Sequence, residues 1–333
     1  MSKLPWLQTV FVESVPEGDS SRILDRLVQE EKCDVVLTTS FGYMDDTIKA
    51  GERYPKTIFM HCSGFKNRPN VGTYFAELYQ MYYLNGLMAG ALTKSGKIGY
   101  VGAFPIPEVV RHINAFALGI KASNPKARVQ VRWIYSWYDP AKAKEAAEAL
   151  VADGCDALAF TEDSASVVEV GQEHTKAGKP VYTFGHYSPM QQFGPDSCVS
   201  GQLVDWGVMY EKIFQDIVNK TWTPDDMWWL AKEGAAKLGG APGVPVNPKF
   251  VSALKAKKVA AKDLGSLSVY DLVMKRYDQM VKGGREAFDP FTGPIVDNKG
   301  QVQIPAGRIA TKEEIMGPAM AYYVDNIAGE VPK

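Results

Sequence analysis

The chain has few of the residues that usually carry redox or metal chemistry. Its 333 residues include only four cysteines and four histidines. The cysteines lie far apart, with no Cys-x-x-Cys pair and no cysteine–histidine spacing typical of a zinc site. The sequence therefore indicates neither a metal centre nor a dithiol site, and we expect no cofactor.

Long apolar runs and an excess of one charge are also missing. No run approaches the roughly 18 apolar residues that span a bilayer. The formal net charge is −1, so no overall positive field attracts nucleic acid or an anionic membrane. The first residues, Met1 to Trp6, lack the apolar stretch of a signal peptide. By themselves these absences favour a cytoplasmic protein, and the length favours about two domains.

Common catalytic motifs are absent as well. No Gly-x-Ser-x-Gly elbow, His-Glu-x-x-His helix or Walker loop occurs. The stretch 97–102 does not form a dinucleotide-binding fingerprint, because Lys97 stands where the first glycine is needed. We therefore expect a protein that is not an enzyme.

What the chain does contain is a regular alternation of two patterns. Short apolar runs rich in β-branched residues predict strands; they are 7–12, 34–39, 57–61, 98–102, 129–135, 157–161 and 180–184. Segments with helical periodicity lie between them, at 20–31, 45–54, 76–93, 108–122, 140–152 and 166–177. The alternation predicts an α/β fold with doubly wound parallel sheets covered by helices on both faces.

A weak internal repeat indicates two related lobes. Residues 26–40 resemble residues 149–164: each is a helix end, a tight turn, a Cys-Asp strand entry and a polar strand exit. We expect lobe 1 to comprise 1–75 and 206–222 and lobe 2 to comprise 76–205, with crossings near Thr73–Ala76 and Gly201–Asp205. Residues 223–333 are expected to pack across the lobes. Ligands bind beyond the carboxyl ends of such strands, which predicts a cleft between the lobes.

Aromatic residues cluster at the predicted strand exits or in adjoining turns. We expect Phe41 and Tyr43 from one lobe, Phe104 and Trp137 from the other, and Trp206 at a crossing to stack on a flat aromatic ligand. The alternative is that some of these rings only seal the lobes.

Polar residues at the same edges are candidates for recognising the rim of such a ring. We expect Asp163, Asp205 and His186 to form hydrogen bonds with the rim of the ligand, since carboxylates accept hydrogen bonds from amines and ring N–H groups. For Glu108 and Asp139 the alternative is a role at a helix start, and Asp139, just before Pro140, is better explained as an N-cap.

Several stretches resemble the basic membrane lipoprotein family, the purine nucleobase and nucleoside substrate-binding proteins of ABC importers. They are Thr39–Asp45 (TSFGYMD), Lys97–Arg111 (KIGYVGAFPIPEVVR), Ile113–Phe116 (INAF), Trp137–Pro140 (WYDP), Thr161–Ser164 (TEDS) and Pro290–Ile295 (PFTGPI). The resemblance runs from about Val12 to the C-terminus. It implies the type I periplasmic binding fold, with two lobes, three crossovers and a ligand clamped between them.

Two departures from the family pattern affect this interpretation. The run Leu7–Val12 resembles the family's second strand, so the first βα unit is expected to be missing, through a late start or a truncation. Nucleoside-binding members carry Gly-Val-Asp-Ser-Asp after a late strand, and its first Asp holds sugar hydroxyls. Here the matching stretch is Gly185-His186-Tyr187-Ser188-Pro189, with Tyr187 at that position. This favours a free base, such as adenine or hypoxanthine, over a nucleoside.

The resemblance also implies partners and a location. A membrane permease is the expected partner, the protein is expected to be a monomer, and the family works in the periplasm or on a lipid anchor. The alternatives are a cytoplasmic purine sensor of the same fold and, less favoured, an enzyme acting on nucleosides.

Overall fold

The computed structural model describes residues 4–332, which divide into two compact units. Unit 1 holds residues 4–77 and 205–229, and unit 2 holds 78–204 and 230–332. The chain therefore passes between the units after Glu77, Val204 and Trp229. The first two passages lie close to the predicted crossings. Residues 223–229 belong to unit 1 and residues 230–332 to unit 2.

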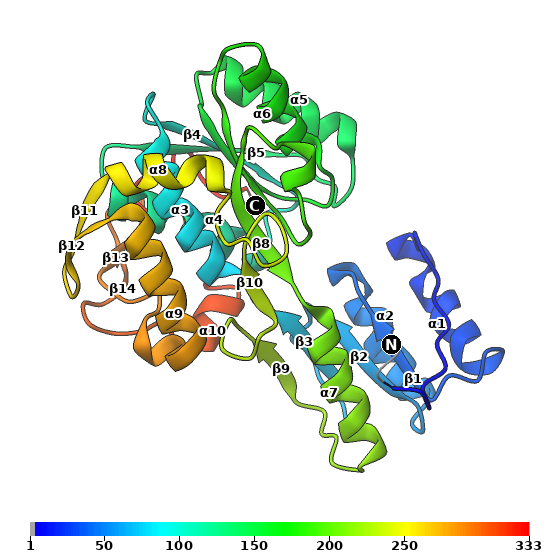
Figure 1. Ribbon diagram of the computed structural model, residues 1–333. Coiled ribbons are helices and arrows are strands. Elements are labelled where there is room, and N and C mark those ends of the chain that lie inside the picture. The colour runs from blue at the N-terminus through cyan, green and yellow to red at the C-terminus, as the bar shows by residue number, and fades with distance from the viewer. Residues whose placement is uncertain (1–3, 333) are drawn as a thin grey trace. The chain divides into compact units, whose positions relative to one another are not determined.

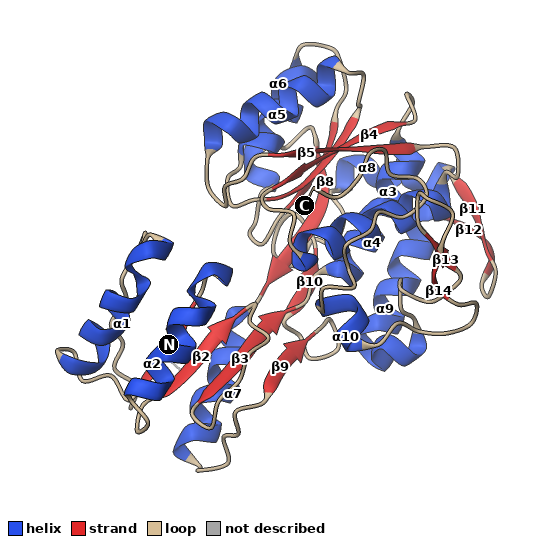
Figure 2. Ribbon diagram, turned by 180° about the vertical axis from the view of Figure 1, so that it is seen from behind, coloured by secondary structure: helices blue, strands red, loops and turns tan. Residues whose placement is uncertain are grey.

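Unit 1 is built on a four-stranded parallel sheet with the order β1-β2-β3-β9, and Figure 2 labels β2, β3 and β9 of this sheet. Its elements are η1 (Glu17–Asp19), α1 (Ser20–Gln29), β1 (Val35–Thr38), η2 (Phe41–Tyr43), α2 (Met44–Arg53), β2 (Ile58–Cys62), β3 (Val71–Ala76), α7 (Trp206–Val218) and β9 (Asp226–Trp229). Buried side chains of α1 and α2 pack on one face of the sheet, against Val36, Phe59 and Val71. On β3, Tyr74 points to the opposite face, where it meets α7.

Unit 2 is built on a six-stranded sheet with the order β10-β8-β7-β6-β4-β5, parallel except for β10 (Figure 1). Its core elements are α3 (Tyr79–Leu92), β4 (Lys97–Gly102), α4 (Pro107–Ser123), β5 (Arg128–Trp133), α5 (Pro140–Ala152), β6 (Ala157–Thr161), α6 (Ser166–Lys176), β7 (Tyr182–Gly185), η3 (Gln191–Phe193), β8 (Cys198–Val204) and β10 (Ala236–Leu238). After β10 follow α8 (Pro248–Ala256), β11 (Lys258–Ala261), β12 (Gly265–Ser268), α9 (Val269–Ala287), β13 (Ile295–Val296), β14 (Val302–Ile304) and α10 (Lys312–Met316).

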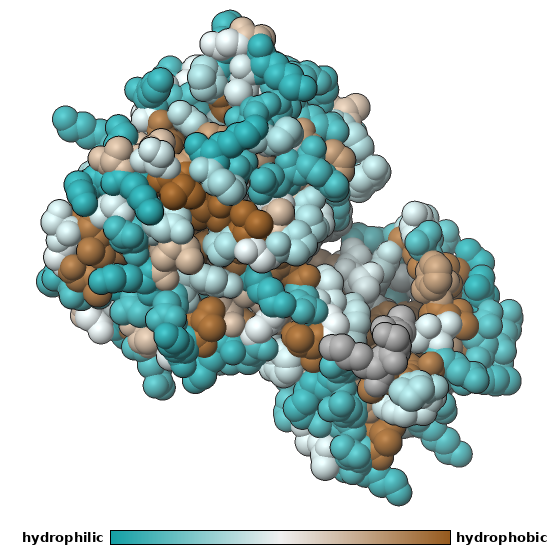
Figure 3. Space-filling model, in the orientation of Figure 1, coloured by the Kyte–Doolittle hydropathy of each residue, from teal (hydrophilic) through white to brown (hydrophobic). Residues whose placement is uncertain are grey.

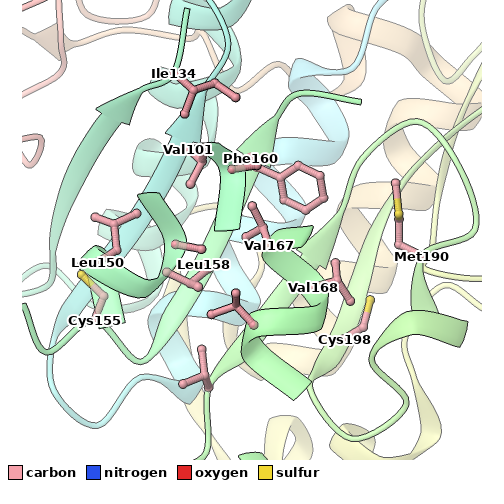
Figure 4. Packing of buried hydrophobic residues seen from close by; sticks show 14 residues of the cluster. Val101, Ile134, Leu150, Cys155, Leu158, Phe160, Val167, Val168, Met190 and Cys198 are labelled. Atoms are coloured by element: carbon pink, nitrogen blue, oxygen red, sulfur yellow. The ribbon is translucent and has the colours of Figure 1, made fainter. Parts of the chain in front are cut away.

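Helices cover the two faces of this sheet differently. On one face α5 and α6 pack on a cluster that includes Val101, Leu158 and Phe160 (Figure 4). Hydrophilic side chains cover most of the surface over these helices in the view of Figure 3. On the other face lie α3 and α4, and α3 is buried along its whole length. An apolar helix buried on every side is a core helix rather than a surface helix.

The contact between α3 and α4 depends on two glycines. A Cβ on Gly119 would lie 2.1 Å from the carbonyl oxygen of Tyr83, and a Cβ on Gly86 would lie 2.1 Å from that of Phe116. Both distances are far below van der Waals contact, so only glycine permits the two backbones to approach this closely. The close contact fixes α4, whose first turn follows the exit of β4.

The structure confirms the predicted α/β class and corrects one predicted strand. Residues 7–12 form no strand, and Val10 and Phe11 are exposed. Their alternating pattern favours a half-buried strand, but a strand also needs a neighbour to take its backbone hydrogen bonds, and no ladder forms here. Conversely, the strands β3, β8, β9, β10, β11 and β12 were not predicted.

Within residues 4–332, no helix is both long and apolar enough to cross a bilayer.

Candidate functional site

The topology of unit 2 places two strand exits beside each other. Strands β4 and β6 are neighbours, and the N–H of Ala103 donates to the carbonyl of Thr161 at 3.0 Å. The helix that follows β4 is α4, which covers one face of the sheet, whereas α6 follows β6 and covers the other. In open α/β sheets ligands bind at such a switch point, beyond the carboxyl ends of the strands. The candidate site is therefore the edge formed by residues 103–108 and 161–164.

Two of the predicted aromatic residues meet at this edge. The rings of Phe104 and Trp137 have centroids 5.3 Å apart and planes inclined by 55°. Both side chains are half-buried. At this distance the rings touch each other, so they form one continuous wall and do not face each other across a ligand. We call this pair the aromatic wall.

A pair of carboxylates borders the aromatic wall. The main-chain N–H of Asp163 donates to the carbonyl of Trp137 at 2.7 Å, which places Asp163 beside the wall. Glu108, in the first turn of α4, is buried, whereas the Asp163 side chain is exposed. Although the side chain reaches solvent, partial desolvation by the surrounding protein raises the pKa of the Asp163 carboxyl to about 6, and the negative charge of Glu108 adds to this effect. The edge thus carries two interacting acidic groups.

The turn after β7 contacts Glu108 through the side chain of Tyr187. Tyr187 has a left-handed backbone, with φ at +58°, and the N–H of Ser188 donates back to the carbonyl of His186 at 2.7 Å. A bulky residue in this conformation is strained, and such strain is typical of functional turns. The Tyr187 hydroxyl donates to Oε1 of Glu108 at 3.3 Å.

His186 lies behind this turn and is only 1% exposed. The ring of Tyr187 stands 3.9 Å from the His186 ring, between centroids. The Tyr82 hydroxyl donates to the carbonyl of Phe160 at 2.6 Å and lies 2.8 Å from Nδ1 of His186. Because that hydroxyl has a single proton, Nδ1 of His186 carries a proton and donates to it. Burial and the charge of His112 hold the pKa of His186 well below its usual value. In this structure His186 supports the turn and does not present its ring to solvent.

Glu162, next to Asp163, stabilises the turn after β6. The N–H and the hydroxyl of Ser164 donate to its two carboxylate oxygens at 2.8 and 3.1 Å. Burial nevertheless raises the pKa of Glu162 to about 7, and the charge of Asp163 contributes. Its role is to fix the backbone that carries Asp163.

The remaining predicted site residues belong to unit 1. Phe41 lies in η2 and packs against the exposed ring of Phe65, with centroids 6.4 Å apart. The hydroxyl of Tyr43 donates to the carbonyl of Val15 at 2.5 Å, so its polar end ties η2 to the preceding loop.

Trp206 and Asp205 stand at the start of α7. Trp206 packs edge-on against Tyr74 at 6.0 Å and stacks on Tyr210 at 6.4 Å. It therefore helps to cover the sheet of unit 1. Asp205 is the N-cap residue of α7, but its side chain makes no capping hydrogen bond. Whether these residues contact a ligand stays a prediction, as it does for Phe104, Trp137, Asp163 and His186.

Glu108 and Tyr187 were not among the predicted site residues, although each had a signal. Glu108 follows Pro107 at a helix start, so a role in stabilising that helix start was an alternative to ligand binding. Asp139 is indeed an N-cap, because its carboxylate accepts from the N–H of Lys142 at 3.1 Å. Glu108, in contrast, contacts Tyr187, which is distant in sequence, and periodicity gives no information on such a contact.

A hollow of about 420 Å³ lies away from this edge, near the amino-terminal end of β5. Its lining includes Arg128, Lys299, Asp325 and Glu330. Lys299 pairs with Glu330 at 3.0 Å, and Asp325 pairs with Lys121 at 2.6 Å. These charges satisfy each other on an open surface, and we assign no ligand there. Among the described residues, no group of three or more His, Cys, Asp or Glu side chains is arranged to hold a metal ion.

Two α/β units joined by three chain passages are the architecture of the type I periplasmic binding class. The chain belongs to the family of PnrA-like ABC transporter substrate-binding proteins, which it matches over residues 6–265. This confirms the family that the sequence motifs indicated.

Individual relatives differ in what they are named for. A purine-binding protein of Brucella abortus is 32% identical over 328 residues, which cover 98% of this chain and 85% of that protein. A putative ABC transporter glucose-binding protein of Haloferax volcanii is 40% identical over 233 residues, 70% of this chain and 58% of that protein. Among solved structures, an ABC transporter solute-binding protein of Aeropyrum pernix superposes with a TM-score of 0.69 at 16% identity, covering 85% of this chain and 84% of that one. The last likeness concerns the fold.

Proposed function

We propose that this chain binds a purine, as the free base in preference to the nucleoside, and delivers it unaltered to the permease of an ABC importer. The observation that carries the proposal is the aromatic wall of Phe104 and Trp137 beside the carboxylates of Asp163 and Glu108. A flat ring with N–H groups at its rim fits both features. Stacking of a base on an aromatic side chain contributes about 1–3 kcal/mol, and hydrogen bonds to a carboxylate add direction.

The preference for a free base rests on Tyr187. Its hydroxyl is engaged with Glu108, and its position is the one at which the resemblance places an acidic residue that holds sugar hydroxyls. A nucleoside therefore lacks a charged acceptor for its sugar at this position, which costs about 1.5–3 kcal/mol of binding free energy.

We propose that no bond of the ligand is made or broken. Ser164 and Glu162, which flank Asp163, are buried and hydrogen-bond each other within one turn. That arrangement fixes the backbone and offers no exposed nucleophile. The site thus fits capture and release, in keeping with a family of substrate-binding proteins.

The partner and the location follow from the same proposal. We propose that the protein works as a monomer outside the cytoplasmic membrane and docks on a permease. A lipid anchor, which the resemblance also implies, stays a prediction.

A sugar is the second candidate ligand, because the Haloferax relative is named as a putative glucose-binding protein. Aromatic rings and carboxylates also bind sugars, through stacking on the sugar face and acceptance from hydroxyls. We favour the purine because the purine-binding relative covers 98% of this chain.

Calorimetric titration of the purified chain against adenine, hypoxanthine, adenosine, guanosine and glucose tests the proposal. We expect a free base to bind with a dissociation constant below about 10 μM, to raise the melting temperature, and to bind more tightly than its nucleoside. Binding of glucose without any purine would overturn the purine proposal and favour the second candidate. Turnover of a nucleoside would overturn the non-catalytic role.

A further inference from the structure

Three residues beside the aromatic wall have hydrogen-bond donors that are engaged within the protein. The hydroxyl of Tyr187 donates to Glu108, and the N–H of Asp163 donates to the carbonyl of Trp137. Both donors of Ser164 bind Glu162. The hydroxyl protons of Tyr187 and Ser164 are therefore used within the protein.

The acceptors, in contrast, exceed these internal donors. A carboxylate has about four acceptor positions. Glu108 accepts the hydroxyl of Tyr187 on Oε1, and Asp163 exposes its side chain beside the wall. Glu108 also lies in the first turn of α4, where the helix dipole stabilises a negative charge. The two carboxylates therefore keep acceptor positions that these contacts do not fill.

We propose that this edge selects purines that carry an exocyclic amine over purines that carry a hydrogen or an oxo group at the same position. The inference rests on the proposed purine-binding function and deepens it. An amine places two N–H donors against Glu108 and Asp163. An oxo group places a second acceptor there, and the resulting repulsion of lone pairs and loss of hydrogen bonds weaken binding.

A series of free bases that differ at one position tests the selection. Adenine, purine and hypoxanthine carry an amine, a hydrogen and an oxo group at C6, and 2-aminopurine carries its amine at C2. We expect adenine or 2-aminopurine to bind at least about tenfold more tightly than both purine and hypoxanthine in calorimetric titrations at pH 7.5. Hypoxanthine or purine binding within threefold of the better amino purine would overturn the inference.

Two variants connect the selection to the carboxylates. Glu108→Gln and Asp163→Asn each replace an acceptor-only group by an amide that presents a donor and an acceptor. We expect each variant to weaken binding of the amino purine by about tenfold or more, while the dissociation constant for hypoxanthine changes by less than threefold. The ratio of the two affinities should therefore fall. Glu145→Gln makes the same change on the exposed face of α5, and we expect it to leave the ratio unchanged.

The controls separate folding, function and selectivity. Because Asp163 is exposed, Asp163→Asn is expected to keep the wild-type melting temperature even if Glu108→Gln does not. If no purine binds the wild-type chain, the proposed function itself fails. If purines bind and the ratio does not respond to either variant, the function stands and this inference is overturned.

Discussion

The hydroxyl of Tyr187 donates to Oε1 of Glu108 at 3.3 Å, although the two residues lie 79 positions apart. This contact joins the turn after β7 to the first turn of α4. It places a tyrosine, held in a left-handed backbone, where an acidic residue of the nucleoside-binding relatives is expected. Under the proposed function, this side chain is the one that favours a free base over a nucleoside.

Replacing Tyr187 by aspartate is expected to shift the preference toward nucleosides. Asp tolerates a positive φ better than Tyr, and its carboxylate offers the sugar a charged acceptor. We expect the ratio of adenosine to adenine affinity to rise by about tenfold, measured by calorimetry. Tyr187→Phe keeps the ring without the hydroxyl, and we expect that control to leave the ratio within threefold of wild type. An unchanged ratio in Tyr187→Asp would contradict the assignment of the sugar position.

Truncation of the aromatic wall is expected to weaken purine binding in a non-additive way. Phe104→Ala and Trp137→Ala should each cost about 1–3 kcal/mol of binding free energy. Because the two rings contact each other at 5.3 Å, the double variant should lose less than the sum of the two. Tyr138→Ala, at a side chain that is 67% exposed, serves as the control and should change the dissociation constant by less than threefold. Strictly additive losses would show that the rings act separately.

The stability of unit 1 is expected to depend on pH through His61. The imidazole is buried, its Nδ1 lies 2.8 Å from the hydroxyl of Thr38, and burial lowers its pKa to about 4. The unfolded chain binds a proton near pH 6.5, so the folded state loses stability as the pH falls from about 6.5 to 4. At pH 5 the free energy of unfolding is lower by roughly 2 kcal/mol for this reason. His61→Asn should show a correspondingly smaller difference between urea unfolding at pH 7.5 and at pH 5, and an identical difference would refute the assignment.

The Asp-Pro-Phe-Thr-Gly-Pro segment is expected to be structural, because Asp289 anchors it. The buried Asp289 carboxylate accepts from the hydroxyl of Tyr79 at 2.7 Å and from the N–H of Phe291 at 2.8 Å, and it pairs with Arg285. Asp289→Asn removes the charge opposite a guanidinium and should lower the free energy of unfolding by about 3 kcal/mol.

A matched control for this change lies on α9. Asp278 pairs with Lys282 at 2.8 Å, but both side chains are exposed. Asp278→Asn should therefore change the free energy of unfolding by less than about 0.5 kcal/mol. Equal effects at the two positions, measured by denaturant unfolding, would exclude the anchoring role of Asp289.

Gly119→Ala is expected to destabilise unit 2, although alanine is normally the better helix former. In a helix interior this exchange usually stabilises by about 1 kcal/mol. Here the new Cβ would lie 2.1 Å from the carbonyl oxygen of Tyr83, so α3 and α4 must separate, at a cost of at least about 2 kcal/mol. Gly18→Ala, where no atom lies within 4 Å of the added Cβ, should change the melting temperature little. A gain in stability at Gly119 would contradict the close packing of these helices.

The sequence alone was sufficient to predict the α/β class, the order of most helices and strands, and the family. Hydrophobic periodicity is a local property, and the helices α2, α4 and α5 begin and end within about two residues of the predicted bounds. The cap at Asp139 was predictable for the same reason, because a cap depends on the next three residues.

Only the tertiary structure decided which of these elements meet. Strand order brings the exit of β4 beside that of β6, so Phe104 and Asp163 share one edge, and no local pattern encodes that order. Leu7–Val12 has the pattern of a strand but finds no partner in this structure, since a strand forms only where another takes up its hydrogen bonds. The hydrogen bond from Tyr187 to Glu108 likewise joins side chains that are far apart in the sequence. Composition and spacing determined the elements and the kinds of residue at their ends, whereas long-range packing decided which of those residues form one site.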